Sequence, residues 1–177
     1  MKNTKVTLAP LAPDDREQFL LDNQRAFKYG ALLEFGERDD HIDDDGEIIS
    51  RETIEHCIDD LKSETYRIVA GGKNVGGVIL KIDQETHHNE LEILFTLPDE
   101  HSKGIGYSAW QAVEALHPET IIWETRTPYF EKSNIHFRVN TDSRSISSGA
   151  SILIQDMKCR RRSTMIPMKV PMKCSVS

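Results

Sequence analysis

The chain has 177 residues, 38% of them hydrophobic, which is enough for one domain with a buried core but not for two. Its formal net charge of −7 argues against a nucleic-acid-binding protein that relies on bulk electrostatic attraction. No apolar run is as long as a membrane span or the apolar part of a signal peptide, so we expect a cytoplasmic protein without a membrane partner.

The charge is divided unevenly along the chain. Residues 1–140 contain 15 Lys or Arg against 27 Asp or Glu, whereas residues 141–177 contain 7 against 2. We therefore expect a single domain over residues 1–140, followed by an atypical basic tail over residues 141–177 that is poorly ordered.

The N-terminal half begins with a strand over Val6–Leu11, and the sequence Ala12–Asp15 is a helix start signal. Residues at helical spacing then follow: Phe19, Leu20, Asn23, Phe27 and Leu32. Ser50 is a candidate N-cap for a second helix, whose buried stripe is expected at Ile54, Ile58 and Leu61.

The hydrophobic period then changes from that of a helix to that of a strand. Tyr66–Ala70 and Val75–Ile82 are expected to form an antiparallel hairpin around the turn Gly71–Asn74. The later elements are expected to be a strand over Glu90–Leu97, a helix with Ile105, Ala109, Val113 and Leu116 on one face, a strand over Thr120–Thr125 and a helix over Glu131–Asn140.

One segment, Leu91 to His117, carries the strongest functional signal. A hydrophobic strand is followed by a Pro-Asp-Glu turn, the residues HSKGIG and an amphipathic helix. In such an arrangement, free N–H groups and the positive end of the helix dipole converge on one point, which is a favourable position for a pyrophosphate. A single Gly-x-Gly is weak evidence, because glycine pairs also serve ordinary turns.

The segment LEILFTLPDEHSKGIGYSAWQAVEAL resembles motif A of the GNAT acetyltransferase superfamily, and YFEKSNIHF resembles the start of its last helix. Together with the element order, this resemblance covers roughly residues 3–137. It implies an α/β (α+β) fold with a mixed, mostly antiparallel central sheet flanked by helices. It also implies an acetyl-CoA-dependent N-acetyltransferase that acts on a primary amine of a small molecule or peptide, without a metal; a homodimer would be compatible with the family.

The resemblance also implies the cofactor-binding residues. The pyrophosphate would lie on the amides of Ser102, Lys103, Gly104, Ile105, Gly106 and Tyr107, and the pantetheine arm would run beside Leu94, Phe95 and Thr96. Asn134 would assist from the last helix, although a helix N-cap or a solvated side chain explains it equally well. His101 stands where the family has Gln or Arg.

Two glutamates are candidates for the base that deprotonates the amine. On a regular strand Glu90 and Glu92 share one face with Leu94 and Thr96, about 7 Å apart, and enclosure of both would discourage one from ionising. Glu90 is preferred by resemblance, Glu124 is a further candidate, and two solvated glutamates are the structural alternative. At the position of the family's Tyr acid the chain has Arg138.

The stretch from Glu37 to Glu47 has seven carboxylates in eleven residues, and His41 to Glu52 has part of a calcium-loop pattern. Because His41 replaces the first ligand, an acidic rim at the acceptor entrance or a solvated loop is a better interpretation. Three cysteines without metal-ligand spacing predict no disulfide framework and no zinc site. Three consecutive arginines, 160–162, without aromatic residues between them do not predict a nucleic-acid partner.

The tail from Thr141 onward lacks the Gly-Phe turn and the closing hairpin of two long strands that the resemblance implies, so this final hairpin is expected to be missing or disordered; only Ile152–Ile154 is strand-like. One permitted codon can be chosen for each residue from Val139 onward so that translation from the third base gives a different sequence. That sequence contains a Gly-Phe turn, and acidic residues replace the basic excess. We therefore hypothesise a frameshift near residues 138–141.

Three functions remain open at this point. The first is an acetyltransferase, the second is a non-catalytic acyl-CoA-binding domain of the same fold, and the third is a calcium-responsive interaction module. The activity of this exact chain depends on the tail, and the sequence does not identify the acceptor.

Overall fold

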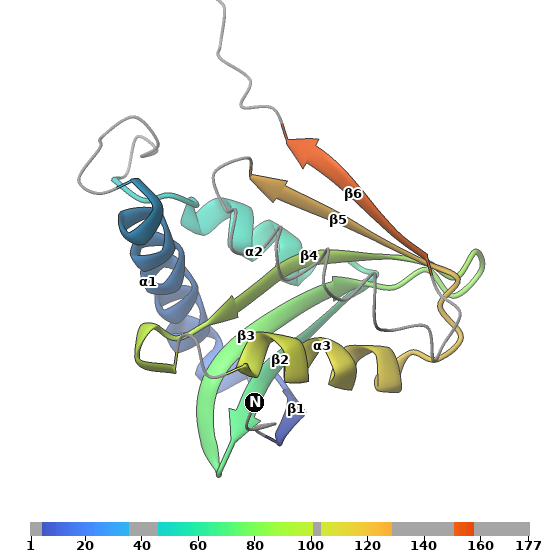
Figure 1. The fold of residues 1–177 in the computed structure, drawn as a ribbon, viewed down its shortest axis with the longest axis horizontal. Helices are drawn as coiled ribbons and strands as arrows, with labels where there is room; N and C mark the ends of the chain where they lie inside the picture. The colour runs from blue at the N-terminus through green and yellow to red at the C-terminus, as the bar shows by residue number, and fades with distance from the viewer. Residues whose placement is uncertain (1–4, 36–45, 101–103, 129–150, 158–177) are drawn as a thin grey trace, which may run out of the picture.

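The computed structural model describes residues 5–35, 46–100, 104–128 and 151–157. Within these residues the chain forms one sheet with helices on both faces (Figure 1). In chain order the elements are β1 (Val6–Pro10), η1 (Pro13–Asp15), α1 (Arg16–Phe35), α2 (Arg51–Asp59), β2 (Ser63–Ala70), β3 (Lys73–Lys81), β4 (His88–Thr96), η3 (Pro98–Glu100), α3 (Ile105–Leu116), β5 (Ile122–Pro128) and β6 (Ser151–Met157).

The strands lie across the sheet in chain order, from β1 to β6. The pairings from β1 to β4 are antiparallel, whereas β4–β5 and β5–β6 are parallel. The mixed, mostly antiparallel sheet flanked by helices confirms the predicted fold class. Among the described residues, β5 is followed by a single strand that pairs in parallel with it, and the strand-like stretch Ile152–Ile154 lies in this strand.

The β2–β3 hairpin turns on Gly71 and Gly72, whose φ angles are 55° and 76°. Two consecutive left-handed residues form a tight turn whose twist matches that of the strands, and glycine adopts this conformation without a steric penalty. The predicted four-residue turn was too long, because Lys73 and Asn74 already pair within β3.

The two helical layers pack against different sets of strand residues. The cluster on the α1 and α2 side consists of Phe19, Leu20, Ile54, Ile79, Ile93 and Phe95. The clusters on the α3 side contain Trp110, Val113, Val78, Leu80, Leu91 and Trp123, and Ile105, Ala109, Ile68 and Val75. In Figure 1, α3 accordingly lies on the opposite side of the sheet from α2.

The predicted N-cap of α2 is confirmed, because Ser50 Oγ accepts a hydrogen bond from the Thr53 amide at 3.2 Å. The predicted stripe of α2 is wrong at its end: the helix stops at Asp59, and Leu61 is fully exposed beyond it. Leu32 and Leu116, at the ends of the two other predicted stripes, are also exposed. Apolar spacing therefore predicted the middle of each helix better than its end.

A bulge in β4 changes which face its side chains occupy. Ile79 of β3 pairs with Ile93 and Leu80 pairs with Leu91, so Glu92 is the extra residue. In a regular strand, two residues that are two positions apart face the same side. Because of the bulge, Leu91 packs on the α3 side whereas Ile93 packs under α1 and α2.

A buried ion cluster attaches α1 to the sheet. The Arg67 guanidinium on β2 donates to both carboxylate oxygens of Asp15, at 2.7 and 2.9 Å, and to Asp22 Oδ2 at 2.7 Å. Its carbon lies 5.0 Å from the centroid of the Phe19 ring, and only 3% of the Arg67 side chain is exposed. These contacts determine how the first half of α1 sits on the sheet.

Several predictions lie outside the described residues. They concern the last helix over Glu131–Asn140, most of the acidic stretch after α1, and the tail on either side of β6.

Candidate active site

The first part of the candidate site is the start of α3, just after β4 and η3. Gly104 precedes the helix with a φ of 73°, and no side chain caps α3 within the described part of the chain. A Cβ built at Gly106 would meet no heavy atom of the described residues within 4 Å. No described side chain therefore covers the first turn of this helix, and an anion-binding helix N-terminus requires such access.

The predicted cofactor residues at this helix start differ in their surroundings. Ile105 is only 2% exposed and its side chain belongs to the core, so only its backbone could contribute to a ligand. Tyr107 is half-buried, and its hydroxyl accepts a hydrogen bond from Gln111 Nε2 at 3.3 Å. Ser102 and Lys103 lie outside the described residues, as does Asn134.

The second part is the edge of β4 that faces β5. Pairing between these strands runs from His88 and Ile122 to Leu91 and Thr125 and then ends, although β4 continues to Thr96 and β5 to Pro128. Figure 1 shows the two strands diverging toward their C-terminal ends. The second half of β4 therefore has no strand partner on this side among the described residues, and an extended ligand could add there as a strand does.

The three residues predicted for the pantetheine arm lie on this part of β4. Leu94 is half-buried and packs against the clusters on the α3 side. Phe95 is 5% exposed, with its ring 5.2 Å from that of Phe19, so its side chain belongs to the opposite core layer. Thr96 is half-buried at the last position of the strand.

The two glutamates lie on the α1 and α2 side of the sheet. Glu90 is opposite Lys81 of β3 and beside Glu124 of β5. Glu92, at the bulge, has its Oε2 3.9 Å from the Cys57 thiol of α2, which donates to it. The prediction that both glutamates share a face with Leu94 is wrong, because the bulge reverses the alternation after Glu92.

The residues around the glutamates have perturbed proton affinities. Burial, followed by the charge of Glu92, raises the pKa of Cys57 to about 11, so this thiol stays protonated at neutral pH. Lys81 Nζ lies 2.8 Å from Asp60 Oδ2, and this hydrogen bond raises the pKa of Lys81. The site thus combines several carboxylates with one ammonium group and one thiol donor.

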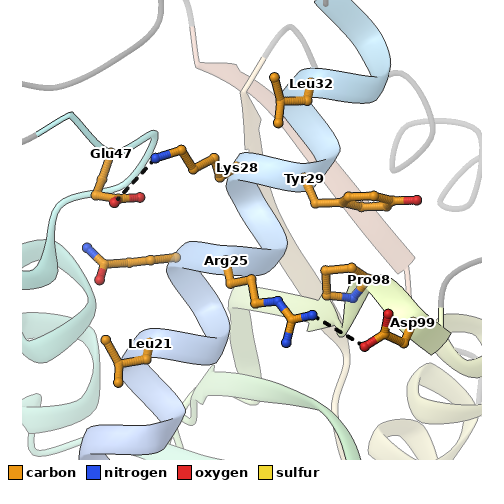
Figure 2. Close-up of a pocket in the computed structure, with 9 residues that line it drawn as sticks. Leu21, Arg25, Lys28, Tyr29, Leu32, Glu47, Pro98 and Asp99 are labelled. Carbon is orange, nitrogen blue, oxygen red and sulfur yellow. Dashed lines mark hydrogen bonds and ion pairs between the residues drawn. The ribbon is translucent and has the colours of Figure 1, made fainter.

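A pocket that the sequence did not predict lies on α1, and its volume is about 520 Å³. Figure 2 shows Arg25 and Tyr29 reaching from α1 toward Pro98 and Asp99 of η3, while Lys28, which lines the same pocket, points away from η3 toward Glu47. Arg25 pairs with Asp99 at 3.3 Å, and Lys28 pairs with Glu47 at 3.7 Å. The sequence signal for this pocket is a set of residues at helical spacing on one face of α1, which includes two leucines that are exposed: Leu21, Gln24, Arg25, Lys28, Tyr29 and Leu32.

Two further properties follow from the described residues alone. They contain no group of three or more His, Cys, Asp or Glu side chains placed to hold a metal ion. In the same part of the chain, no helix combines the length and apolar character needed to cross a membrane.

The fold is an α/β sheet whose fourth and fifth strands diverge beside a Gly-x-Gly helix start that no described side chain caps. This geometry is typical of proteins that bind an extended ligand with phosphate groups. The model of the acetyltransferase (GNAT) family matches residues 24–137. The chain belongs to this family, and the resemblance seen in the sequence is confirmed.

Known proteins extend this comparison. The uncharacterized protein YrkN of Bacillus subtilis (strain 168) is 40% identical over 136 residues, which are 77% of this chain and 71% of YrkN. The PaiA N-acetyltransferase of Thermoplasma acidophilum, solved in complex with coenzyme A, has a TM-score of 0.58 at 16% identity. The match spans 77% of this chain and 88% of the PaiA chain. The ribosomal-protein-S18-alanine N-acetyltransferase of Escherichia coli has a TM-score of 0.56 at 12% identity, over 76% and 75% of the two chains.

Proposed function

We propose that this chain transfers an acetyl group from acetyl-CoA directly to a primary amine of a small molecule or peptide. The observation that carries the proposal is the divergence of β4 and β5 beside the Gly104 helix start, in a chain of the acetyltransferase (GNAT) family. The complex of the PaiA neighbour with coenzyme A supports the same co-substrate. Acetyl-CoA supplies an acetyl group activated as a thioester.

In this proposal, the chain binds the co-substrate mainly through its backbone. The amides of residues 102–107 hold the pyrophosphate, and the open edge of β4 from Leu94 to Thr96 holds the pantetheine arm. The geometry at Gly104 and Gly106 supports this assignment, because neither residue places a side chain over the helix start. Asn134 is a further proposed ligand from the last helix.

The amine must lose a proton before its nitrogen can attack the thioester carbonyl. We assign this step to a carboxylate of the Glu90 and Glu92 pair. Glu92 lies one residue beyond the last pairing of β4 with β5, next to the unpaired edge, whereas Glu90 is still within the paired region. The C–N bond forms, the C–S bond breaks, and the thiolate takes up one proton, for which no side chain is assigned.

The first experiment is a thermal-shift and calorimetric titration of the whole chain with acetyl-CoA, CoA and a nucleotide control. A ligand at a hundred times its dissociation constant adds about 2.7 kcal/mol of stability, so a saturable shift is expected. A cooperative melt without any shift would refute the co-substrate assignment.

Gly106→Ala tests the helix start more specifically. The added methyl group meets no described residue and alanine favours a helix, so the melting temperature should stay the same or rise. Affinity for CoA should nevertheless fall, because the methyl group occupies the space beside the first-turn amides. Ala115→Ser, at an exposed position near the other end of α3, is the control and should leave affinity unchanged.

Glu90→Gln and Glu92→Gln test the base, with Glu85→Gln in the exposed β3–β4 connection as the control. Thiol release would be followed with a panel of polyamines, aminoglycosides, amino acids and peptides. Loss of a general base typically lowers the rate by about 10² to 10⁴, so one of the first two variants should lose turnover while still binding CoA.

A second candidate is a non-catalytic acyl-CoA-binding domain, which is favoured by Arg138 at the position of the family's Tyr acid. Saturable binding of acetyl-CoA, together with no thiol release across the whole panel, would select this candidate.

A further inference from the structure

Arg25 lies in the middle of α1, on the wall of the pocket beside η3. Its guanidinium Nη2 is 3.3 Å from Asp99 Oδ2, and Figure 2 shows the side chain extending from the helix toward this carboxylate. Asp99 precedes Gly104, the N-cap residue of α3, by five positions. Arg25 therefore places a positive charge next to the turn that leads to the proposed phosphate-binding amides.

The ion pair between Arg25 and Asp99 is weakly held. It has a single contact, and 59% of the Arg25 side chain and 81% of the Asp99 side chain are exposed. By comparison, Arg16 holds Asp59 through two hydrogen bonds of 2.6 and 2.7 Å. Exposed pairs with a single long contact contribute little to stability, so the guanidinium can change partner at low cost.

Arg25 is carried by a part of α1 whose position on the sheet is well determined. Arg67 holds Asp22 of the preceding turn through a 2.7 Å hydrogen bond, and Phe19 and Leu20 are completely buried under the same helix. The Cα of Arg25 therefore has a well-determined position, while its exposed guanidinium can pair with Asp99 or with another anion. A positioned guanidinium suits phosphate, because its planar donors can form two hydrogen bonds to the oxygens.

The turn before α3 begins with negative charges of its own. Asp99 and Glu100 are adjacent carboxylates of η3, in a chain with a net charge of −7, and His101, Ser102 and Lys103 follow them in the sequence before Gly104. Both repel a phosphate that approaches the first-turn amides. Among the described residues, Arg25 is the basic side chain that pairs with Asp99 of this turn.

We propose that Arg25 binds a phosphate group of the CoA moiety and releases Asp99 as it does so. This inference rests on the proposed function and adds a ligand from α1, on the other side of the sheet from α3. Asp99 then acts as a competitor for the guanidinium, so the two residues have opposite effects on affinity.

The test compares CoA, dephospho-CoA and pantetheine, which lacks phosphate groups, by isothermal titration calorimetry on the whole chain. Arg25→Gln should weaken CoA binding by about tenfold, which corresponds to about 1.4 kcal/mol, and should not change pantetheine binding. Lys28→Gln is the matched control: it removes the same charge from the same helix, but Lys28 faces Glu47 and not η3. It should change CoA affinity by less than about twofold.

Asp99→Asn gives the second arm of the test. It removes both a competitor and a repelling charge, so CoA binding should become about threefold tighter. In the Asp99→Asn background, Arg25→Gln should still weaken CoA binding. A residue that only neutralises Asp99 would have no effect in that background.

Three results would overturn the inference: equal losses for the Arg25 and Lys28 variants, an equal loss with pantetheine, or no effect of Arg25→Gln once Asp99 is neutral. If dephospho-CoA shows the full effect of Arg25→Gln, the ligand of Arg25 is the pyrophosphate; if dephospho-CoA loses the effect, it is the 3′-phosphate. Failure of the unaltered chain to bind CoA would refute the proposed function, and this inference with it, which distinguishes that outcome from the other three.

Discussion

Replacing Arg67 by methionine should strongly destabilise the fold. The substitution keeps an unbranched apolar stem but removes the guanidinium that holds Asp15 and Asp22. Asp22 has only 12% of its side chain exposed, so its carboxylate would remain in a poorly solvated place without its strongest partner. The contact of the guanidinium with the Phe19 ring would be lost as well.

The magnitude follows from burial. Removing one partner of a buried pair costs about 3 to 5 kcal/mol, because the remaining charge is uncompensated. For a chain of this size, a change of that order lowers the melting temperature by about 10 °C. A second substitution, Asp22→Asn, should recover part of the loss, since a buried amide is less costly than a buried charge.

The assay is urea unfolding followed by circular dichroism, with Arg16→Met as the control. Arg16 also holds an aspartate through two short hydrogen bonds, but 35% of its side chain and 61% of that of Asp59 are exposed. Its loss should therefore cost less than about 1 kcal/mol. Equal shifts for the two variants would refute the argument that burial sets the strength of these interactions.

Three further predictions concern other parts of the molecule. Gly77→Ala should lower the urea midpoint, because its Cβ would overlap the rings of Phe19 and Phe95 in the core; an unchanged midpoint would contradict this overpacking. Burial and the charge of Glu92 raise the pKa of Cys57 to about 11. At pH 8 the native thiol should therefore react with iodoacetamide on the order of a hundredfold more slowly than after unfolding. Peptide mass spectrometry measures both rates, and equal rates would contradict the burial. The hydrogen bond from Lys62 lowers the pKa of Asp83, so stabilisation by this carboxylate is present above its ordinary pKa of about 4 and is lost as the pH falls through the folded-state pKa. Asp83→Asn should therefore lower the melting temperature at pH 7 but progressively less in acid, and a difference independent of pH would exclude this linkage.

The local features of the fold could be predicted from neighbouring residues. Gly71 and Gly72 predicted a hairpin because two left-handed residues in succession are a glycine conformation. Ser50 predicted a helix start because its hydroxyl can reach an amide three residues later. The strand, turn and Gly-x-Gly of the candidate site were likewise visible, since they are contiguous in the chain.

The faces of β4 could not be predicted in the same way. Alternation placed Leu94 beside Glu92, and it would have been correct for a regular strand. The bulge depends on the register with β3, where one residue of β3 is matched by two of β4. Which side chains of β4 face the proposed acceptor side is thus decided by the partner strand.

Taken alone, the sequence determined the family, the order of the elements from β1 to β5 and the position of the Gly-x-Gly helix start, because each of these depends on residues close together in the chain. Only the tertiary structure decided that β4 parts from β5 after Leu91, that Arg67 is a buried anchor, and that Arg25 faces Asp99. Arg67 reaches partners 45 and 52 positions away, and Arg25 reaches one 74 positions away. The partners of a charged side chain are set by how helices and strands pack, and no local pattern in the sequence records that choice.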